Sequence, residues 1–295
     1  MTTPYLPLSL SREQMIEYTP EWEGRRADDG RPFVSDDIIE RMKQVTITEA
    51  WMTMYYRDEY HFQYEDGWER VRPDTILCGR ALTAMFMPRR KSLHAVVEAR
   101  ARAAGQVGDQ VSWPIYALNE GDVYVADVFG KVDRGPIIGD NLGTAIYRRS
   151  KRGTVQNAAI RDLDGLQEIE GFTAFTRGAH PSFASPTVTI VGINCPVRIG
   201  KVMVFPGDVV LGKQDGLIFI PPHLAERVVI TSEIIRVRDI FGKQRLNEGK
   251  YLPGEIDGKW TETIELDFRR WLKDSGTQLP IPAETIASYL GPRSW

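Results

Sequence analysis

Cysteine is scarce in this sequence, which holds two cysteines among 295 residues. Cys78 and Cys195 lie far apart, and neither belongs to a CxxC pair. A disulfide framework needs more cysteines and a thiolate zinc site needs closer spacing, so the pattern argues against both. Each cysteine lies beside an apolar, strand-like segment, which predicts two buried thiols.

Long apolar runs and a strong charge excess are also missing. No run reaches the roughly 18 apolar residues that a membrane-spanning helix needs. The first residues, MTTPYLPLSL, lack the charged start and the apolar run of a signal peptide. The net charge is only -3, and the basic residues are spread along the chain, which argues against nucleic acid as the main partner. We therefore expect a cytoplasmic protein without a membrane or nucleic-acid partner.

Common catalytic motifs are absent as well. The chain has no Walker lysine motif, no HExxH and no GxSxG. Three glycines come nearest to a GxGxxG loop but have the wrong spacing: Gly130, Gly135 and Gly139. The four histidines are scattered and favour surface, capping or core roles over metal binding: His61, His94, His180 and His223. Of these, His180 lies in a glycine-containing loop that could reach a substrate site.

The residues that are present suffice for a packed core, because 42% of them are hydrophobic. Periodicity predicts helices at residues 35–45, 48–56, 93–104 and 223–240. It predicts strands at residues 76–87, 122–128, 154–159, 187–193, 202–210 (with a turn) and 216–220. This alternation predicts an α/β or α+β class with one central core.

The chain ends differ from this core in composition. We predict an N-terminal arm at residues 1–34, a core domain at 35–241 and a C-terminal extension at 242–295. The extension would pack on the body or on a neighbouring subunit. Residues 58–73 are aromatic and charged without clean periodicity, which indicates an insertion or a contact surface.

The stretch Gly139-Asp140-Asn141-Leu142 opens a predicted helix. The first backbone N–H groups of a helix have no internal partners, so they can bind a carboxylate or a phosphate. Asp140 has two interpretations. It either caps the helix or faces a site, where it would accept a proton or orient a water.

A second polar cluster follows the predicted strand at 154–159. Asp162 can supply a hard oxygen ligand to Mg²⁺ or Mn²⁺, and Arg161 can stabilise a developing oxyanion. The alternative is a surface Arg–Asp ion pair of little energetic worth. The later stretch Val204–Asp208 is most simply a structural turn, in which the aspartate bonds to local backbone.

Taken together, these residues resemble the family of the regulator of ribonuclease activity A. This family includes class II 4-hydroxy-4-methyl-2-oxoglutarate/4-carboxy-4-hydroxy-2-oxoadipate aldolases, and its members are often labelled demethylmenaquinone methyltransferases. The aldolase pattern is a glycine, a spacer of about twenty residues and then Arg-Asp, which Gly139 and Arg161-Asp162 match. Further landmarks match along residues 35–240: Gly79–Thr83, Glu120–Val123, Pro196-Val197, Phe205–Asp208 and Asp215-Gly216.

The resemblance implies an α/β fold of the swivelling β/β/α (RraA-like) type, assembled as trimers or hexamers. It implies a lyase that uses Mg²⁺ or Mn²⁺ to cleave pyruvate-derived 2-oxo acids or to decarboxylate oxaloacetate. Asp162 would bind the metal, and Arg161 would contact the keto oxygen and the enolate. The helix start at Gly139, with the backbone of Asn141 and Leu142, would hold the substrate carboxylate. Asp140 would position a water on the metal for proton transfer.

This sequence departs from the aldolase pattern at Gly165, where aldolases typically have another acid. Asp164 or Glu168 could substitute through water. Two other functions stay open at this point. One is a non-catalytic binding protein that regulates a ribonuclease, and the other is a hydratase or dehydratase acting on a related carboxylated substrate. The methyltransferase label is not favoured, because no glycine-rich nucleotide loop is present.

Overall fold

The computed structural model describes residues 9–57 and 60–290. Its contacts divide the chain into two units. The first comprises residues 1–43 and 62–225, and the second comprises residues 44–61 and 226–295. The predicted arm, core domain and extension, with boundaries after residues 34 and 241, remain predictions.

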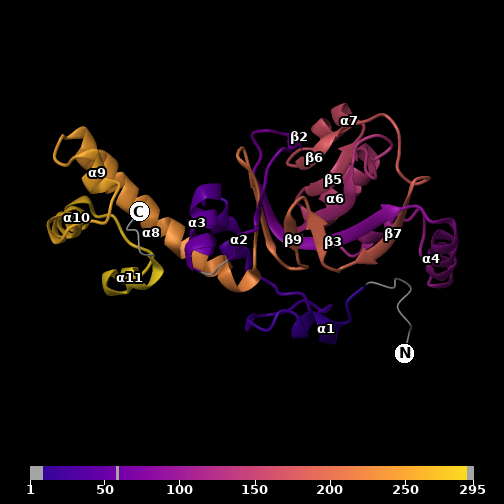
Figure 1. The fold of residues 1–295 in the computed structure, drawn as a ribbon, viewed down its shortest axis with the longest axis horizontal. Coiled ribbons are helices and arrows are strands. Elements are labelled where there is room, and N and C mark those ends of the chain that lie inside the picture. Colours follow the sequence, from indigo (N-terminus) through magenta and orange to yellow (C-terminus); the bar gives the residue numbers. More distant parts are fainter. Residues whose placement is uncertain (1–8, 58–59, 291–295) are drawn as a thin grey trace. The chain divides into compact units, whose positions relative to one another are not determined.

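The first unit is built on a nine-stranded mixed sheet in the order β1-β11-β10-β3-β4-β5-β6-β2, with β7 paired to β3 (Figure 1). The neighbours β3, β4, β5 and β6 run parallel, and the other pairs of this sheet are antiparallel. The strands are β1 (Tyr64–Glu65), β2 (Glu69–Arg70), β3 (Leu77–Pro88), β4 (Asp122–Lys131), β5 (Thr154–Ile160), β6 (Ala174–Ala179), β7 (Val188–Ile193), β10 (Val209–Lys213) and β11 (Gly216–Ile220), with a separate hairpin of β8 (Val197–Ile199) and β9 (Val202–Val204).

Side chains of the central strands alternate between two buried faces, as the two-residue period of a strand requires. On β4, Tyr124 and Ala126 join the core beneath helices α4 to α7, while Val123 and Val125 join the core beneath the β8–β9 hairpin. These helices are α4 (Lys91–Ala103), α5 (Trp113–Tyr116), α6 (Asp140–Ser150) and α7 (Leu163–Glu168). The predicted α/β class is therefore confirmed, and both cysteines are buried as predicted.

The predicted insertion at residues 58–73, which the structure describes from residue 60, contributes two short strands to the sheet. Strand β1 pairs with β11 at one end of the strand order, and β2 pairs with β6 at the other end. Only three residues separate β1 from β2, so the two ends lie within about 15 Å of each other. Arg177 on β6 reinforces this closure by donating to the Glu65 carboxylate, at 2.7 Å, and to the Asp66 and Gly67 carbonyl oxygens. The sheet therefore curls until its ends almost meet.

Most predicted elements are confirmed, and their ends follow local capping. Helix α2 (Asp36–Met42) begins after Ser35, whose hydroxyl accepts from the Ile38 N–H. The short helix α1 (Arg12–Glu17) was not predicted, and Ser11 caps it through a capping box.

Within residues 9–57 and 60–290, no helix is both long and apolar enough to cross a membrane.

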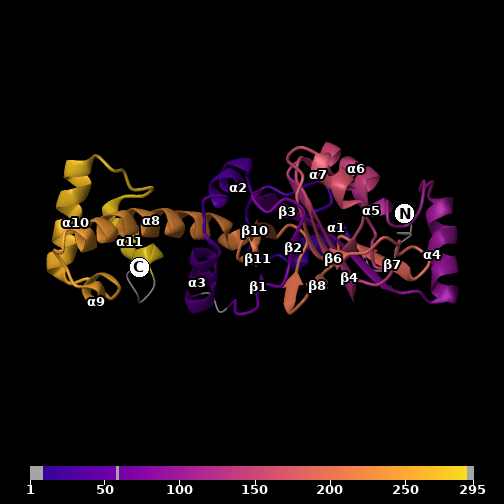
Figure 2. The same cartoon turned by 90° about the horizontal axis from the view of Figure 1, so that it is seen from above.

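The second unit is helical (Figure 2). Its own core is largely aromatic. It contains α3 (Ile47–Arg57), most of α8 (Ala225–Asn247), α9 (Pro253–Ile256), α10 (Glu262–Ser275) and α11 (Ile286–Tyr289), with a short 3-10 turn at Ala283–Thr285. A second 3-10 turn, Pro222–Leu224, precedes α8 and belongs to the first unit. The predicted helix end at residue 240 is wrong, because α8 continues to Asn247. Phe241 is fully buried against Trp260, Phe268 and Trp271, so tertiary packing carries the helix through a polar sequence.

Arg72 ties the end of helix α7 to the segment that carries β2. Its guanidinium donates to the carbonyl oxygens of Gln167 and Ile169, two groups at the C-terminal end of α7 that the helix leaves without internal partners. The Thr173 hydroxyl donates in return to the Arg72 carbonyl oxygen. This clamp fixes a short helix that begins directly after Asp162.

We expect Arg72→Ala to lower the free energy of unfolding by about 1–3 kcal/mol, because the Gln167 and Ile169 carbonyl oxygens both lose the guanidinium and Ile169 keeps only the Phe172 N–H as a donor. Denaturant titration of the purified chain measures this. Arg102→Ala serves as the control, because the Arg102 side chain is 77% exposed. Equal stability of the two variants would contradict the clamp.

Asp208 confirms the predicted turn, since its carboxylate accepts from the Phe205 N–H at 2.8 Å. Burial raises the pKa of this carboxyl from its ordinary value of 3.8 to about 7, and the bond from Phe205 offsets only part of that. The folded state therefore holds this proton more tightly than the unfolded chain does. Protonation of Asp208 therefore stabilises the folded state. This contribution to the unfolding free energy is complete below about pH 4 and is lost as the pH rises through about 7.

We expect Asp208→Asn to flatten the dependence of the unfolding free energy on pH between about 4 and 7, because an amide does not titrate there but still accepts the Phe205 bond. Each unit of raised pKa corresponds to about 1.4 kcal/mol. Thermal or urea unfolding across this range, with the exposed Asp74→Asn as control, measures the difference. A pH profile parallel to that of the unmodified chain would refute this role.

Candidate active site

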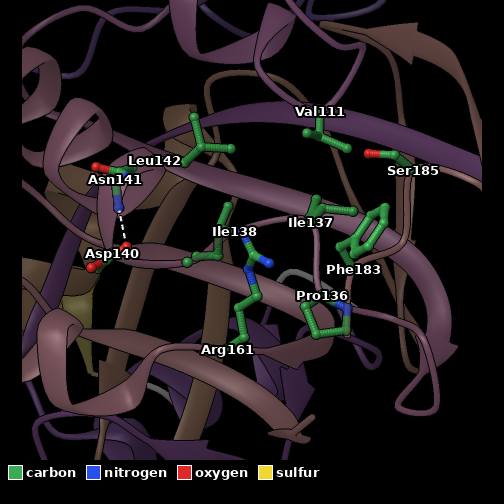
Figure 3. A pocket seen from close by; sticks show the side chains of 11 residues that line it. Val111, Pro136, Ile137, Ile138, Asp140, Asn141, Leu142, Arg161, Phe183 and Ser185 are labelled. Carbon is green, nitrogen blue, oxygen red and sulfur yellow. Dashed lines mark hydrogen bonds between the residues drawn. The ribbon is translucent and has the colours of Figure 1, made fainter. Parts of the chain in front are cut away.

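A pocket of about 150 Å³ opens where the loop before α6, the end of β5 and the loop after β6 come together (Figure 3). Parallel strands β4 and β5 end on this side of the sheet, so the segments that follow them converge. The pocket is lined by Val111, Pro136, Ile137, Ile138, Gly139, Asp140, Asn141, Leu142, Arg161, Phe183 and Ser185.

The absence of a side chain at Gly139 brings the two predicted clusters together. A Cβ atom at this position would overlap the Asp162 carboxylate and would lie 3.0 Å from Arg161 Nε. The Arg161 N–H also donates to the Ile138 carbonyl oxygen at 3.3 Å, which joins the end of β5 to the loop before α6. The predicted link between Gly139 and Arg161-Asp162 is therefore a direct spatial contact.

Asp162 lies between β5 and α7 in a left-handed backbone conformation, with φ 55° and ψ 48°. Aspartate tolerates this region better than most residues. Its carboxylate lies 3.3 Å from Arg161 Nε, and both side chains are over 40% exposed. An ion pair this exposed contributes little free energy, so the carboxylate can accept a cation at low cost. Arg161 lines the pocket itself, whereas Asp162 lies behind it, against Gly139.

The start of helix α6 forms the polar end of the pocket. Gly139 is the N-cap and offers no side-chain cap. Asp140 is therefore the first residue of the helix rather than its cap, which corrects the capping interpretation. Its carboxylate instead accepts from the Asn141 N–H at 2.7 Å (Figure 3). Of the two amides predicted to hold a substrate carboxylate, the Asn141 amide is thus engaged, and Leu142 lines the pocket beside it.

Gly165 leaves no room for the acid that the aldolase pattern has there. A Cβ atom at Gly165 would lie 2.8 Å from Asp140 Cβ and 2.9 Å from Asp140 Oδ2. The Asp140 carboxylate therefore occupies the space beside this position. Asp164 and Glu168 are exposed on α7 and do not line the pocket, and their water-mediated role remains a prediction.

The loop after β6 reaches the pocket, as predicted, but through residues other than its histidine. His180 bonds to Ser182 at 2.8 Å and to Asp133 at 3.4 Å, and it does not line the pocket. Phe183 and Ser185 line it instead. Neither residue could be singled out from the sequence beyond the loop itself, because a phenylalanine and a serine in a loop carry no distinctive pattern.

The donor set is suited to a hard divalent cation. Within residues 9–57 and 60–290, no group of three or more His, Cys, Asp or Glu side chains is placed to enclose a metal ion. Mg²⁺ often keeps several waters and needs only one or two carboxylates together with substrate oxygens. Asp140 lines the pocket and Asp162 lies behind it against Gly139, so each of these carboxylates could serve as such a ligand.

Two named proteins share sequence with this chain. A "Putative 4-hydroxy-4-methyl-2-oxoglutarate aldolase" of Halalkalibacterium halodurans is 34% identical over 115 residues, which is 39% of this chain and 53% of that protein. "Protein DlpA" of Legionella pneumophila is 24% identical over 176 residues, which is 60% of this chain and 26% of that protein. The chain thus spans about half or less of the length of these relatives.

The fold has a solved counterpart in Streptomyces coelicolor RraAS2, described as an unusual member of the RNase ES inhibitor RraA protein family. The two share a TM-score of 0.61 at 22% identity, over 75% of this chain and all of that one. The family described as RraA-like (Aldolase/RraA) matches residues 45–219, which is more than half of the sequence. The family match and the fold agree with each other, and the chain belongs to the RraA-like family.

Proposed function

We propose that this protein is a divalent-metal-dependent carbon–carbon lyase acting on a 2-oxo acid, by retro-aldol cleavage of a 4-hydroxy-2-oxo acid or by decarboxylation of an oxaloacetate-type substrate. One observation carries the proposal. Gly139 lets a helix start and the Arg161 guanidinium meet at one pocket, with the exposed Asp162 carboxylate directly behind Gly139. The aldolase named among the relatives supports the same reaction class.

The three groups match the parts of a 2-oxo acid. The N-terminal turn of α6 suits the substrate carboxylate, because the helix dipole and the Leu142 amide favour an anion, while the Asn141 amide already donates to Asp140. Arg161, the cation among the residues that line the pocket, suits the keto oxygen, where negative charge develops. Asp162 would hold Mg²⁺ or Mn²⁺, which when bound supplies a Lewis acid that polarises the keto group.

In the retro-aldol reaction, the hydroxyl at C4 loses its proton and the C3–C4 bond breaks. C4 becomes the carbonyl carbon of the leaving product, and the bonding electrons pass into the enolate of pyruvate. Arg161 stabilises that enolate, which then takes a proton at C3. Asp140 is placed at the pocket to hold or move these protons, directly or through a water. Decarboxylation of oxaloacetate ends in the same enolate, with CO₂ as the leaving product.

The resemblance to this family also supports assembly as a homotrimer or homohexamer. We propose such an assembly, with sites close to subunit boundaries. Light scattering of the purified chain gives its mass directly. A monomeric species that retains full activity would contradict this part of the proposal.

We expect Asp162→Asn to lower kcat/KM for pyruvate release by about 100-fold or more, because it removes the metal-binding charge. Asparagine also tolerates the left-handed backbone, so the fold should stay intact. Chelation with EDTA should abolish activity, and adding back Mg²⁺ or Mn²⁺ should restore it. Asp164→Asn is the matched control on α7 and should keep most of the activity. Pyruvate release that persists both in the presence of EDTA and in the Asp162→Asn variant would contradict the proposed mechanism.

We expect Gly139→Ala to disable the site although it replaces no polar side chain. The added methyl group overlaps the Asp162 carboxylate, so Asp162 and Arg161 must move. Because a shift of about 1 Å can cost 100-fold in rate, kcat/KM should fall by about that factor. Gly254→Ala is the control, since a Cβ there meets open space. Equal activity of the two variants would show that the close approach has no catalytic role.

A further inference from the structure

The pocket has two chemically different ends. The helix start and Arg161 form the polar end, and the other end is formed by Val111, Ile137 and Phe183. In Figure 3, Asp140 and Asn141 lie on one side of the view and the apolar group on the other, and the Arg161 guanidinium lies between the two groups. A substrate that places its carboxylate and keto group at the polar end must therefore direct its remaining atoms, the tail, toward apolar side chains.

The described residues that line the apolar end include no cation that could pair with a second carboxylate of the substrate. Among the described residues that line the pocket, Arg161 is the one with a positive charge, and the proposed function assigns it to the keto oxygen. An anion placed against apolar side chains without a partner loses its hydration and gains nothing in return. The apolar end therefore selects against a tail that carries a carboxylate.

An acid already stands behind the apolar end. The Ser185 hydroxyl donates to the Asp109 carboxylate at 3.0 Å, and the Val111 N–H donates to the same oxygen at 3.1 Å. These bonds hold a negative charge next to two pocket residues and occupy the one hydroxyl group at that end. A tail carboxylate would meet repulsion there instead of a donor.

Phe183 offers a surface that an apolar tail would cover. Its side chain is exposed over 54% of its area although it lines the pocket. Removing apolar surface from water favours association, and an aromatic ring offers a large area of it. Burial of the tail against this ring would add affinity for an uncharged tail only.

We propose that the tail of the substrate is uncharged and apolar, so that retro-aldol cleavage releases an aliphatic or aromatic aldehyde or ketone together with pyruvate. This inference rests on the proposed function and narrows it to the aldolase reaction, away from diacids such as oxaloacetate. Phe183 then determines specificity by contacting the tail. Asp109 is a positioning residue, because it holds the Ser185 hydroxyl.

Two substrates of nearly equal shape test this. The tail of 4-hydroxy-5-methyl-2-oxohexanoate is an isopropyl group, which yields 2-methylpropanal, and that of 4-hydroxy-2-oxoglutarate is a carboxylate, which yields glyoxylate. We expect kcat/KM to be at least about tenfold higher for the isopropyl compound. Phe183→Arg should reverse or cancel this preference by supplying a cation. Met203→Arg, at a position 67% exposed on β9, should leave the ratio unchanged.

A binding assay separates this inference from the proposed function. The compounds 5-methyl-2-oxohexanoate and 2-oxoglutarate lack the C4 hydroxyl and cannot undergo retro-aldol cleavage, so calorimetry with Mg²⁺ present measures tail preference alone. Tighter binding of 5-methyl-2-oxohexanoate without any pyruvate release from the hydroxy acids would overturn the proposed function and uphold the tail preference. Preference for the diacid in either assay, or an unchanged ratio in Phe183→Arg, would overturn the tail preference.

Discussion

The site depends on one steric constraint, which is that residue 139 has no side chain. The loop before α6 and the segment after β5 approach so closely that a Cβ atom would overlap the Asp162 carboxylate. The sheet sets up this approach by running β4 and β5 parallel, and Arg72 holds the far end of α7. A helix start, a guanidinium and a carboxylate, each common on protein surfaces, lie side by side as a result, and the proposed function depends on that proximity.

Sequence reasoning reached much of the fold because the strands have simple patterns. Strand β4 alternates between two cores, and the predicted strand at residues 122–128 follows that alternation. Sequence reasoning failed where distant contacts decide local structure. Helix α8 continues past residue 240 because Phe241 is buried among aromatic residues far along the chain. The closure of the sheet by β1 and β2 was equally invisible, since two-residue strands carry no period.

For the site, the polar residues could be predicted and the apolar ones could not. Gly139, Arg161 and Asp162 form a spaced motif, and the structure brings them into contact. Gly165 looks in sequence like the loss of an acid, but the structure shows that the Asp140 side chain fills the space beside it. Val111, Ile137 and Phe183 look like ordinary core or loop residues in sequence, and only their place around the pocket distinguishes them. The proposed specificity therefore rests on the structure and could not be inferred from the sequence pattern.

The central claim is that Asp162 holds a divalent cation beside a 2-oxo acid seated at the start of α6. A crystal structure with Mn²⁺ and oxalate, a mimic of the pyruvate enolate, tests this most directly through the anomalous signal of the metal. The account predicts a peak about 2.0–2.3 Å from an Asp162 oxygen, with oxalate between the metal, Arg161 and the α6 amides. A metal bound elsewhere, or oxalate bound without contact to Arg161, would contradict it.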